Sequence, residues 1–188
     1  MIFTSEALIS ELIELTKQNI KSVENLTQKP IHELNWKADA KTWSGLECIE
    51  HLNLCSDFYL PKIERGIDGS TSTFEANYKS DVLSHYFAKS MLPKEKLNKV
   101  KTFKKVNPNG SDLTVSTLQR FLTLQEKTLL LLKKSKNINL NTIKVPSMLG
   151  KIFKLKIGDA FRVVIYHNLR HIIQAQKTLE IKANNPKH

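Results

Sequence analysis

Apolar residues recur at the three- and four-residue spacing of a helix near the start of the chain. The pattern covers residues 5 to 27 and ends before Pro30, and Thr4 stands in front of it as an N-cap. The apolar stripe consists of Leu8, Leu12, Leu15, Val23 and Leu26. This stretch therefore predicts a long amphipathic helix.

A second helix is predicted directly after Ser44. Ser44 and Glu47 have the spacing of a capping box, and Trp43, just before the cap, is placed to pack on Cys48 as a hydrophobic staple. We expect this helix to end at Pro61 or slightly beyond. One of its faces carries Cys48, His51, Leu52, Cys55 and Tyr59.

Two further helices are predicted in the second half of the chain. Ser116 and Gln119 have the spacing of another capping box, and an apolar stripe follows them. The stripe consists of Leu118, Leu122, Gln125, Leu129 and Leu132. The fourth helix is expected over residues 160–181, with Gly158 as a break in front of it and Asp159 as its N-cap.

The connections between these helices have weaker patterns. Residues 66–113 read as irregular, with a stretch at 81–89 that is compatible with a short helix, and residues 137–157 form a second linker. Four long helices with two extended connections predict an all-α fold. It is a four-helix bundle with a long irregular connection between helices 2 and 3. We expect the 188 residues to form a single domain, 1–188.

The composition fits a folded chain in a reducing compartment. The chain is 40% hydrophobic and 25% charged, with six Gly and six Pro. Its first residues lack the pattern of a secretion signal, and no apolar run is long enough to cross a bilayer. Cys48 and Cys55 lie about 10 Å apart along one predicted helix, too far for a disulfide. We therefore expect free thiols and a cytoplasmic protein.

The formal net charge of +11 raises the question of nucleic-acid binding. Lysines cluster between residues 89 and 105 and again between 133 and 136. However, Phe103 is the one aromatic residue among the first cluster, and no recognised binding motif contains these lysines. We expect a solvated basic surface, with no nucleic-acid and no membrane partner. Binding of nucleic acid or anionic membrane through residues 89–105 is the less favoured alternative.

The fourth predicted helix carries a stripe that turns polar partway along. Its members, spaced by three or four residues, are Ala160, Val164, His167, His171, Gln174 and Thr178. The small and apolar residues at its start indicate that the stripe faces the bundle interior. An unpartnered polar group there costs roughly 1–3 kcal/mol, and a metal ion would remove that cost.

A three-histidine metal site is the hypothesis that follows. His51 lies in an apolar stripe of the second helix, so its imidazole can converge with those of His167 and His171. Three neutral imidazoles with open positions form the reactive kind of first-row metal site, whereas a structural site has four protein ligands. Gln174 is placed to hold a ring or a water. The alternative is a bundle without catalytic activity, in which the histidines are hydrogen-bonded core residues.

Two stretches resemble the DinB-like superfamily, and most closely its DinB_2 type. The first is LNWKADAKTWSGLECIEHLNL, in which the histidine follows the cap serine by seven residues. The second is YHNLRHIIQAQ, with its H-x3-H-x2-Q spacing. The linker VPSMLGKIFKLKIGDAF is similar too, and the resemblance covers most of the chain outside residues 67–113.

The resemblance implies a fold and a chemistry. Members of that family are up-down-down-up four-helix bundles in which one histidine of the second helix and two of the fourth bind a divalent metal, often nickel or zinc. The implied ligands are His51, His167 and His171, and Gln174 matches a frequent glutamine. Characterised relatives are metal-dependent hydrolases, or transferases and isomerases that use small thiols such as bacillithiol, mycothiol or glutathione. We expect a small-molecule substrate, and a homodimer as an alternative assembly.

Overall fold

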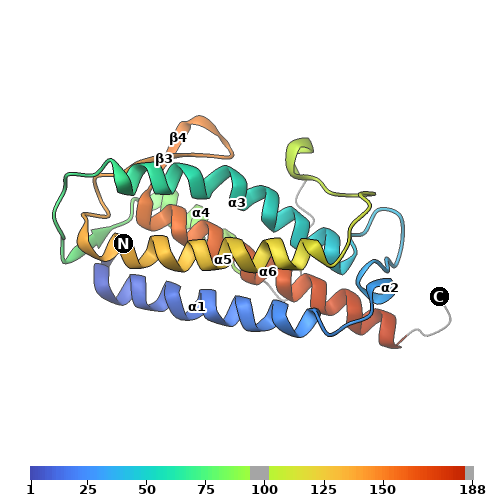
Figure 1. Ribbon diagram of the computed structural model, residues 1–188. Helices are drawn as coiled ribbons and strands as arrows, with labels where there is room; N and C mark the ends of the chain where they lie inside the picture. Colours follow the sequence, from blue (N-terminus) through green and yellow to red (C-terminus); the bar gives the residue numbers. More distant parts are fainter. Residues whose placement is uncertain (94–101, 185–188) are drawn as a thin grey trace.

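The fold is described by a computed structural model that covers residues 1–93 and 102–184, with the backbone alone for Lys151. This part of the chain is mostly helical, and four long helices lie side by side (Figure 1). They are α1 (Ser5–Leu26), α3 (Gly45–Asp68), α5 (Ser116–Lys134) and α6 (Ile157–Asn184). The mostly helical character predicted from the apolar stripes is confirmed.

The four long helices pack around a common core. Helix α3 contacts α5 and α6, and α1 contacts the same two helices, which places α1 diagonally across from α3. In the view of Figure 1, α1 and α6 run from left to right, and α3 and α5 run from right to left. The bundle therefore brings α3, which carries His51, into direct contact with α6, which carries His167 and His171.

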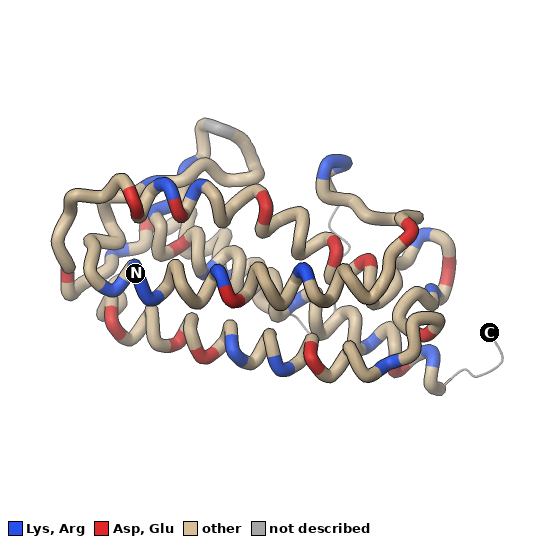
Figure 2. The backbone as a smooth tube through the Cα atoms, viewed as in Figure 1, with Lys and Arg blue, Asp and Glu red and all other residues tan. Residues whose placement is uncertain are grey.

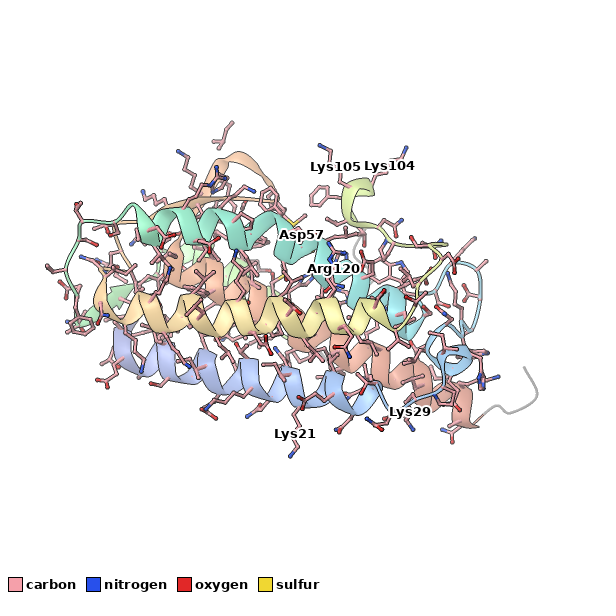
Figure 3. All side chains as sticks on the ribbon, in the orientation of Figure 1. Lys21, Lys29, Asp57, Lys104, Lys105 and Arg120 are labelled. Atoms are coloured by element: carbon pink, nitrogen blue, oxygen red, sulfur yellow. The ribbon has the colours of Figure 1, made fainter. Side chains whose placement is uncertain are left out.

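Acidic side chains of α3 pair with basic side chains of α5 at intervals close to two helical turns. Arg120 pairs with both Glu50 and Asp57, and Asp57 and Arg120 point toward one another in Figure 3. Further along, Lys127 lies 2.6 Å from Glu64. Residue numbers rise together on both helices, so α3 and α5 run in the same direction. Each pair is partly exposed and contributes only about 0–1 kcal/mol.

Shorter elements fill the connections. They are α2 (Ile31–Leu34), α4 (Val82–Ser90) and the 3-10 turns η1 (Lys104–Val106) and η2 (Ser135–Asn137). Two antiparallel strand pairs join β1 (Ile2–Thr4) to β2 (Asn77–Lys79), and β3 (Lys144–Ser147) to β4 (Gly150–Lys156). Helix α4 matches the short helix expected at 81–89, whereas the strand pairs were not expected.

Of the two predicted capping boxes, one forms. At α3, the Glu47 backbone N–H donates to Ser44 Oγ at 3.1 Å and the Ser44 N–H donates to Glu47 Oε2 at 2.9 Å. At α5 the prediction was wrong, because the N-cap is Val115 and no side chain caps it. Ser116 is already helical, and its hydroxyl lies 2.7 Å from that of Thr114.

Helix α3 was expected to end at Pro61 or slightly beyond, and it continues for seven residues past that proline. Pro61 has no N–H, so the carbonyl of Asp57 lacks its usual helical partner, at a cost of about 3 kcal/mol for an interior proline. The helix nevertheless extends to Asp68. Ile63 and Ile67 in the added turns are buried in the hydrophobic core, and this burial favours continuation.

Helix α6 begins earlier than predicted. It follows β4 directly at Ile157, so Gly158 is not a break and Asp159 is not the N-cap. Gly158 lies inside the helix, and the ring of Tyr78 packs so closely on it that a Cβ there would come 2.7 Å from Tyr78 Cζ. Asp159 is buried and lies 2.7 Å from Nη1 of the buried Arg162.

The core consists of two hydrophobic clusters with a polar layer between them. Along each long helix, polar buried residues lie between members of the first cluster and members of the second. We define the polar layer as Thr16, Asn19, Asn53, Ser56, Gln125, Thr128 and Asn168. The Asn168 amide donates to Gln125 Oε1 at 3.0 Å, and the Asn19 amide donates to the Ile165 carbonyl at 3.3 Å.

Charges are spread over the surface. Figure 2 shows Lys and Arg interspersed with Asp and Glu along the long helices. Lys104 and Lys105 extend from η1 away from the bundle (Figure 3). Four lysines of the predicted basic segment, Lys94, Lys96, Lys99 and Lys101, lie outside the described residues. Among the helices of residues 1–93 and 102–184, none has the length and apolar character needed to cross a membrane.

Candidate metal centre

Three imidazoles from α3 and α6 meet at one point. Nε2 of His167 lies 3.4 Å from Nε2 of His51 and 3.0 Å from Nε2 of His171. One ring nitrogen of each histidine lies within 4.8 Å of the ring nitrogens contributed by the other two. Nitrogens that bind one ion at about 2.0–2.1 Å in a tetrahedral site are about 3.3 Å apart. The three rings expected to converge from the sequence do so.

Contacts on the far side of two rings fix where their protons lie. Nδ1 of His51 is 2.6 Å from the carbonyl oxygen of Val106. A carbonyl can only accept, so this nitrogen carries the proton and the lone pair is on Nε2. Nδ1 of His171 lies 2.9 Å from Oε1 of Gln174, which gives His171 the same tautomer. The Nε2 lone pairs of His51 and His171 therefore both face His167, as binding of one shared metal ion would require.

Burial keeps the three rings neutral. It lowers the pKa of His51, and it lowers the pKa of His167 well below its usual value, with the neighbouring His171 adding to the effect. Burial and the nearby His51 lower the pKa of His171 to about 3. Neutral imidazole is the form that binds a metal ion. At pH 7 the cluster therefore has the protonation state that a metal requires.

The lowered pKa values predict acid sensitivity of the metal-free protein. Between pH 3 and 6.5 His171 is protonated in the unfolded chain and neutral in the folded chain. The contribution of His171 to the free energy of unfolding is therefore fully present above pH 6.5 and is lost as the pH falls. From pH 7 to 5.5 we expect a loss of about 1 kcal/mol from this residue alone. Urea unfolding of chelator-treated protein at both pH values measures it. A His171→Asn variant should show a shallower pH dependence, and equal slopes would contradict the assignment.

An indole and a thiol lie beside the imidazoles. The ring of Trp43 is centred 4.8 Å from that of His51 and 5.7 Å from that of His171. Sγ of Cys55 is 3.8 Å from Nε2 of His51, and burial raises the pKa of this thiol to about 12, so it stays protonated. Cys55 and Cys48 are both buried and free, as expected.

Two of these neighbours were not foreseen from the sequence as parts of the site. Val106 contacts His51 through its backbone carbonyl, a group that every residue possesses, so its identity carries no signal. Trp43 was expected only as a staple on the start of the second helix. It packs against the cluster that contains Cys48, and it also covers two of the imidazoles.

These features define a helical protein with a three-histidine cluster suited to a metal ion, in which His51 is buried and His167 and His171 are half-buried. The chain belongs to the DinB superfamily, whose family model matches residues 11–175. The match runs from within α1 to within α6 and includes the three histidines and Gln174. Neither the curated proteins nor the solved structures provided a match to the chain.

Proposed function

We propose that this chain is an enzyme that depends on a divalent metal ion held by His51, His167 and His171. The observation that carries the proposal is the convergence of three Nε2 atoms, two of them on rings whose protons are held at Nδ1. Hydrogen bonds among the rings cannot satisfy this arrangement. A proton on His167 Nε2 can be donated to one neighbour at a time, and if it goes to His171 the lone pair of His51 Nε2 has only the weak S–H donor of Cys55, at 3.8 Å.

A bundle without catalytic activity is the alternative. In that case the histidines are only core hydrogen-bond partners, and one Nε2 acceptor has no donor better than the weak S–H of Cys55, whereas a buried acceptor with no donor at all costs roughly 1–3 kcal/mol. One cation at the centre of the three Nε2 atoms relieves the mismatch for all of them. This difference favours the metal centre.

The residues around the centre suit metal-assisted chemistry. When bound, a divalent ion supplies a Lewis acid that lowers the pKa of a water to about 7 or stabilises a thiol as its thiolate. His51, His167 and His171 would hold the ion, and three protein ligands leave a position open. The Val106 carbonyl and Gln174 orient the rings of His51 and His171, and the indole of Trp43 packs beside both rings.

The reaction that we propose is hydrolysis, or an S-transfer or isomerisation that uses a low-molecular-weight thiol. Membership of the DinB superfamily supports both branches, with nickel or zinc as the metal and a small molecule as the substrate.

The two free, buried cysteines support a cytoplasmic location. The helix directions in Figure 1 and the pairing of α3 with α5 support the up-down-down-up order, and the contacts between α1 and α6 support a single domain over residues 1–188.

Metal analysis tests the proposal. Protein purified without chelator should contain about one divalent ion per chain, as expected for a three-histidine site. Replacement of His51, His167 or His171 by alanine should remove most of it. A His32→Ala variant is the matched control, because His32 is exposed on the short helix α2 and should not affect metal content. Equal metal content in all four variants would overturn the proposal.

A further inference from the structure

The carboxylate of Glu47 lies buried at the start of α3 and accepts hydrogen bonds from three groups. Oε2 accepts from the backbone N–H of Ser44 at 2.9 Å, which is the capping contact. Oε1 accepts from the backbone N–H of Gly110 at 2.6 Å and from Lys37 Nζ at 2.9 Å. Lys37 also donates to Oδ1 of Asn109 at 2.7 Å. Glu47 thus joins two segments, residues 37–44 and 106–110, that are far apart in the sequence.

Each of these two segments supplies one contact to the histidine cluster. Val106, four residues before Gly110, provides the carbonyl that accepts the Nδ1 proton of His51 at 2.6 Å. Trp43, next to Ser44, provides the ring centred 4.8 Å from that of His51. Both contacts fall on the same imidazole, and both depend on where their segments lie.

We propose that Glu47 is a positioning residue of the metal centre. Its carboxylate holds residues 106–110 and 37–44 against the start of α3, so that the Val106 carbonyl fixes the tautomer of His51 and Trp43 covers the ring. The effect on metal affinity rests on the proposed function, whereas the effect on His51 does not. Capping of α3 alone would use Oε2 and leave Oε1 to solvent, yet Oε1 is the atom that reaches the second segment.

Only an acceptor at both oxygens fits these three donors. In a Glu47→Gln variant, the side-chain amide would turn its own N–H groups toward Ser44 N–H, or toward Gly110 N–H and Lys37. Two donors that face one another make no hydrogen bond and leave buried groups unsatisfied. We expect the 106–110 segment to lose its direct contact with the start of α3 while the long helices keep their packing.

Nuclear magnetic resonance of the metal-free protein tests the geometric part. In the wild type, the Nδ1 proton of His51 should give a resolved, slowly exchanging signal because it is buried in a hydrogen bond to Val106. The signal should be lost or broadened in Glu47→Gln. The matched control is Ser44→Ala, which removes the acceptor of the Glu47 N–H at a helix-cap cost of about 1 kcal/mol but leaves the carboxylate contacts intact. This control should keep the signal.

Zinc or nickel titration tests the functional part. We expect Glu47→Gln to bind the ion about 10- to 100-fold more weakly than the wild type, the usual effect of losing a contact that orients a ligand. Ser44→Ala should bind like the wild type. If Glu47→Gln does not fold, Lys37→Met reports on the same anchor and should weaken binding in the same direction.

The two parts fail separately. A His51 signal and an ion affinity in Glu47→Gln that equal those of the wild type would overturn the inference. An unaltered His51 signal alone would overturn it as well, because positioning of the ring is its content. If the wild type binds no ion, the proposed function fails, and the His51 signal of the metal-free variants still decides the role of Glu47.

Discussion

Saturating Zn²⁺ or Ni²⁺ should raise the free energy of unfolding of the chelator-treated protein by about 4 kcal/mol at about 1,000 times the Kd. An ion that binds the folded chain and not the unfolded chain stabilises by mass action. Only folding brings His51 of α3 within 3.4 Å of His167 of α6. Each kcal/mol shifts the Tm of a chain of this size by roughly 2–4 °C, so the rise should be roughly 8–16 °C. Thermal unfolding with and without the ion measures it.

The controls separate a specific site from general metal effects. His167→Ala should abolish most of the rise, because His167 Nε2 faces both of the other rings. His32→Ala should keep the full rise, since this imidazole is exposed. The interpretation would be wrong if the ion stabilised His167→Ala as much as the wild type, or if it stabilised neither. Chelation of the loaded wild type should return its Tm to the metal-free value.

Replacement of Asp159 by asparagine should lower the free energy of unfolding by about 3–5 kcal/mol. Asp159 and Arg162 form an ion pair in which the two side chains are 0% and 3% exposed. Ser80 Oγ also lies 2.9 and 2.8 Å from the two carboxylate oxygens. The asparagine keeps the shape of the side chain but removes its charge, and the buried guanidinium of Arg162 then has no counterion. Urea unfolding at pH 7 measures the loss.

An exposed pair of the same spacing provides the matched control. Lys17 and Glu14 are also three residues apart on a helix and lie 2.6 Å apart, but their side chains are 57% and 61% exposed. Glu14→Gln should therefore change stability by less than about 1 kcal/mol. In the double variant Asp159→Asn with Arg162→Met, much of the loss should be recovered, because no buried charge remains. Equal losses for Asp159→Asn and Glu14→Gln would contradict the importance of burial.

The sequence predicted the long helices because their apolar stripes have a period that only a helix satisfies. It predicted their ends less well. The cap at Ser44 depends on residues three apart, and it formed. Gly158 was expected to break the chain before the fourth helix, but it lies inside α6, where the ring of Tyr78, 80 positions away, packs on it. Both strand pairs were missed, although β3 and β4 are close neighbours in the segment read as a linker. Each strand is short, and β1 finds its partner β2 more than 70 residues later.

The histidines were predictable and their surroundings were not. His167 and His171 lie one turn apart, and His51 lies on an apolar face, so all three could be assigned to the interior from their spacing. Gln174 followed from the same stripe, and it does contact His171. The Val106 carbonyl could not be found in this way, because a backbone contact between residues 51 and 106 depends on the path of an irregular segment and not on its side chains.

The polar layer in the middle of the bundle affects how His51 on α3 is aligned with His167 and His171 on α6. If α6 slid along α3 by one turn, about 5.4 Å, the Asn168 amide would leave Gln125 and enter an aliphatic cluster. Each buried amide stranded in this way costs roughly 1–3 kcal/mol. The layer therefore disfavours other lengthwise offsets of α6 against its neighbours. At the offset that it stabilises, His51 lies level with His167 and His171.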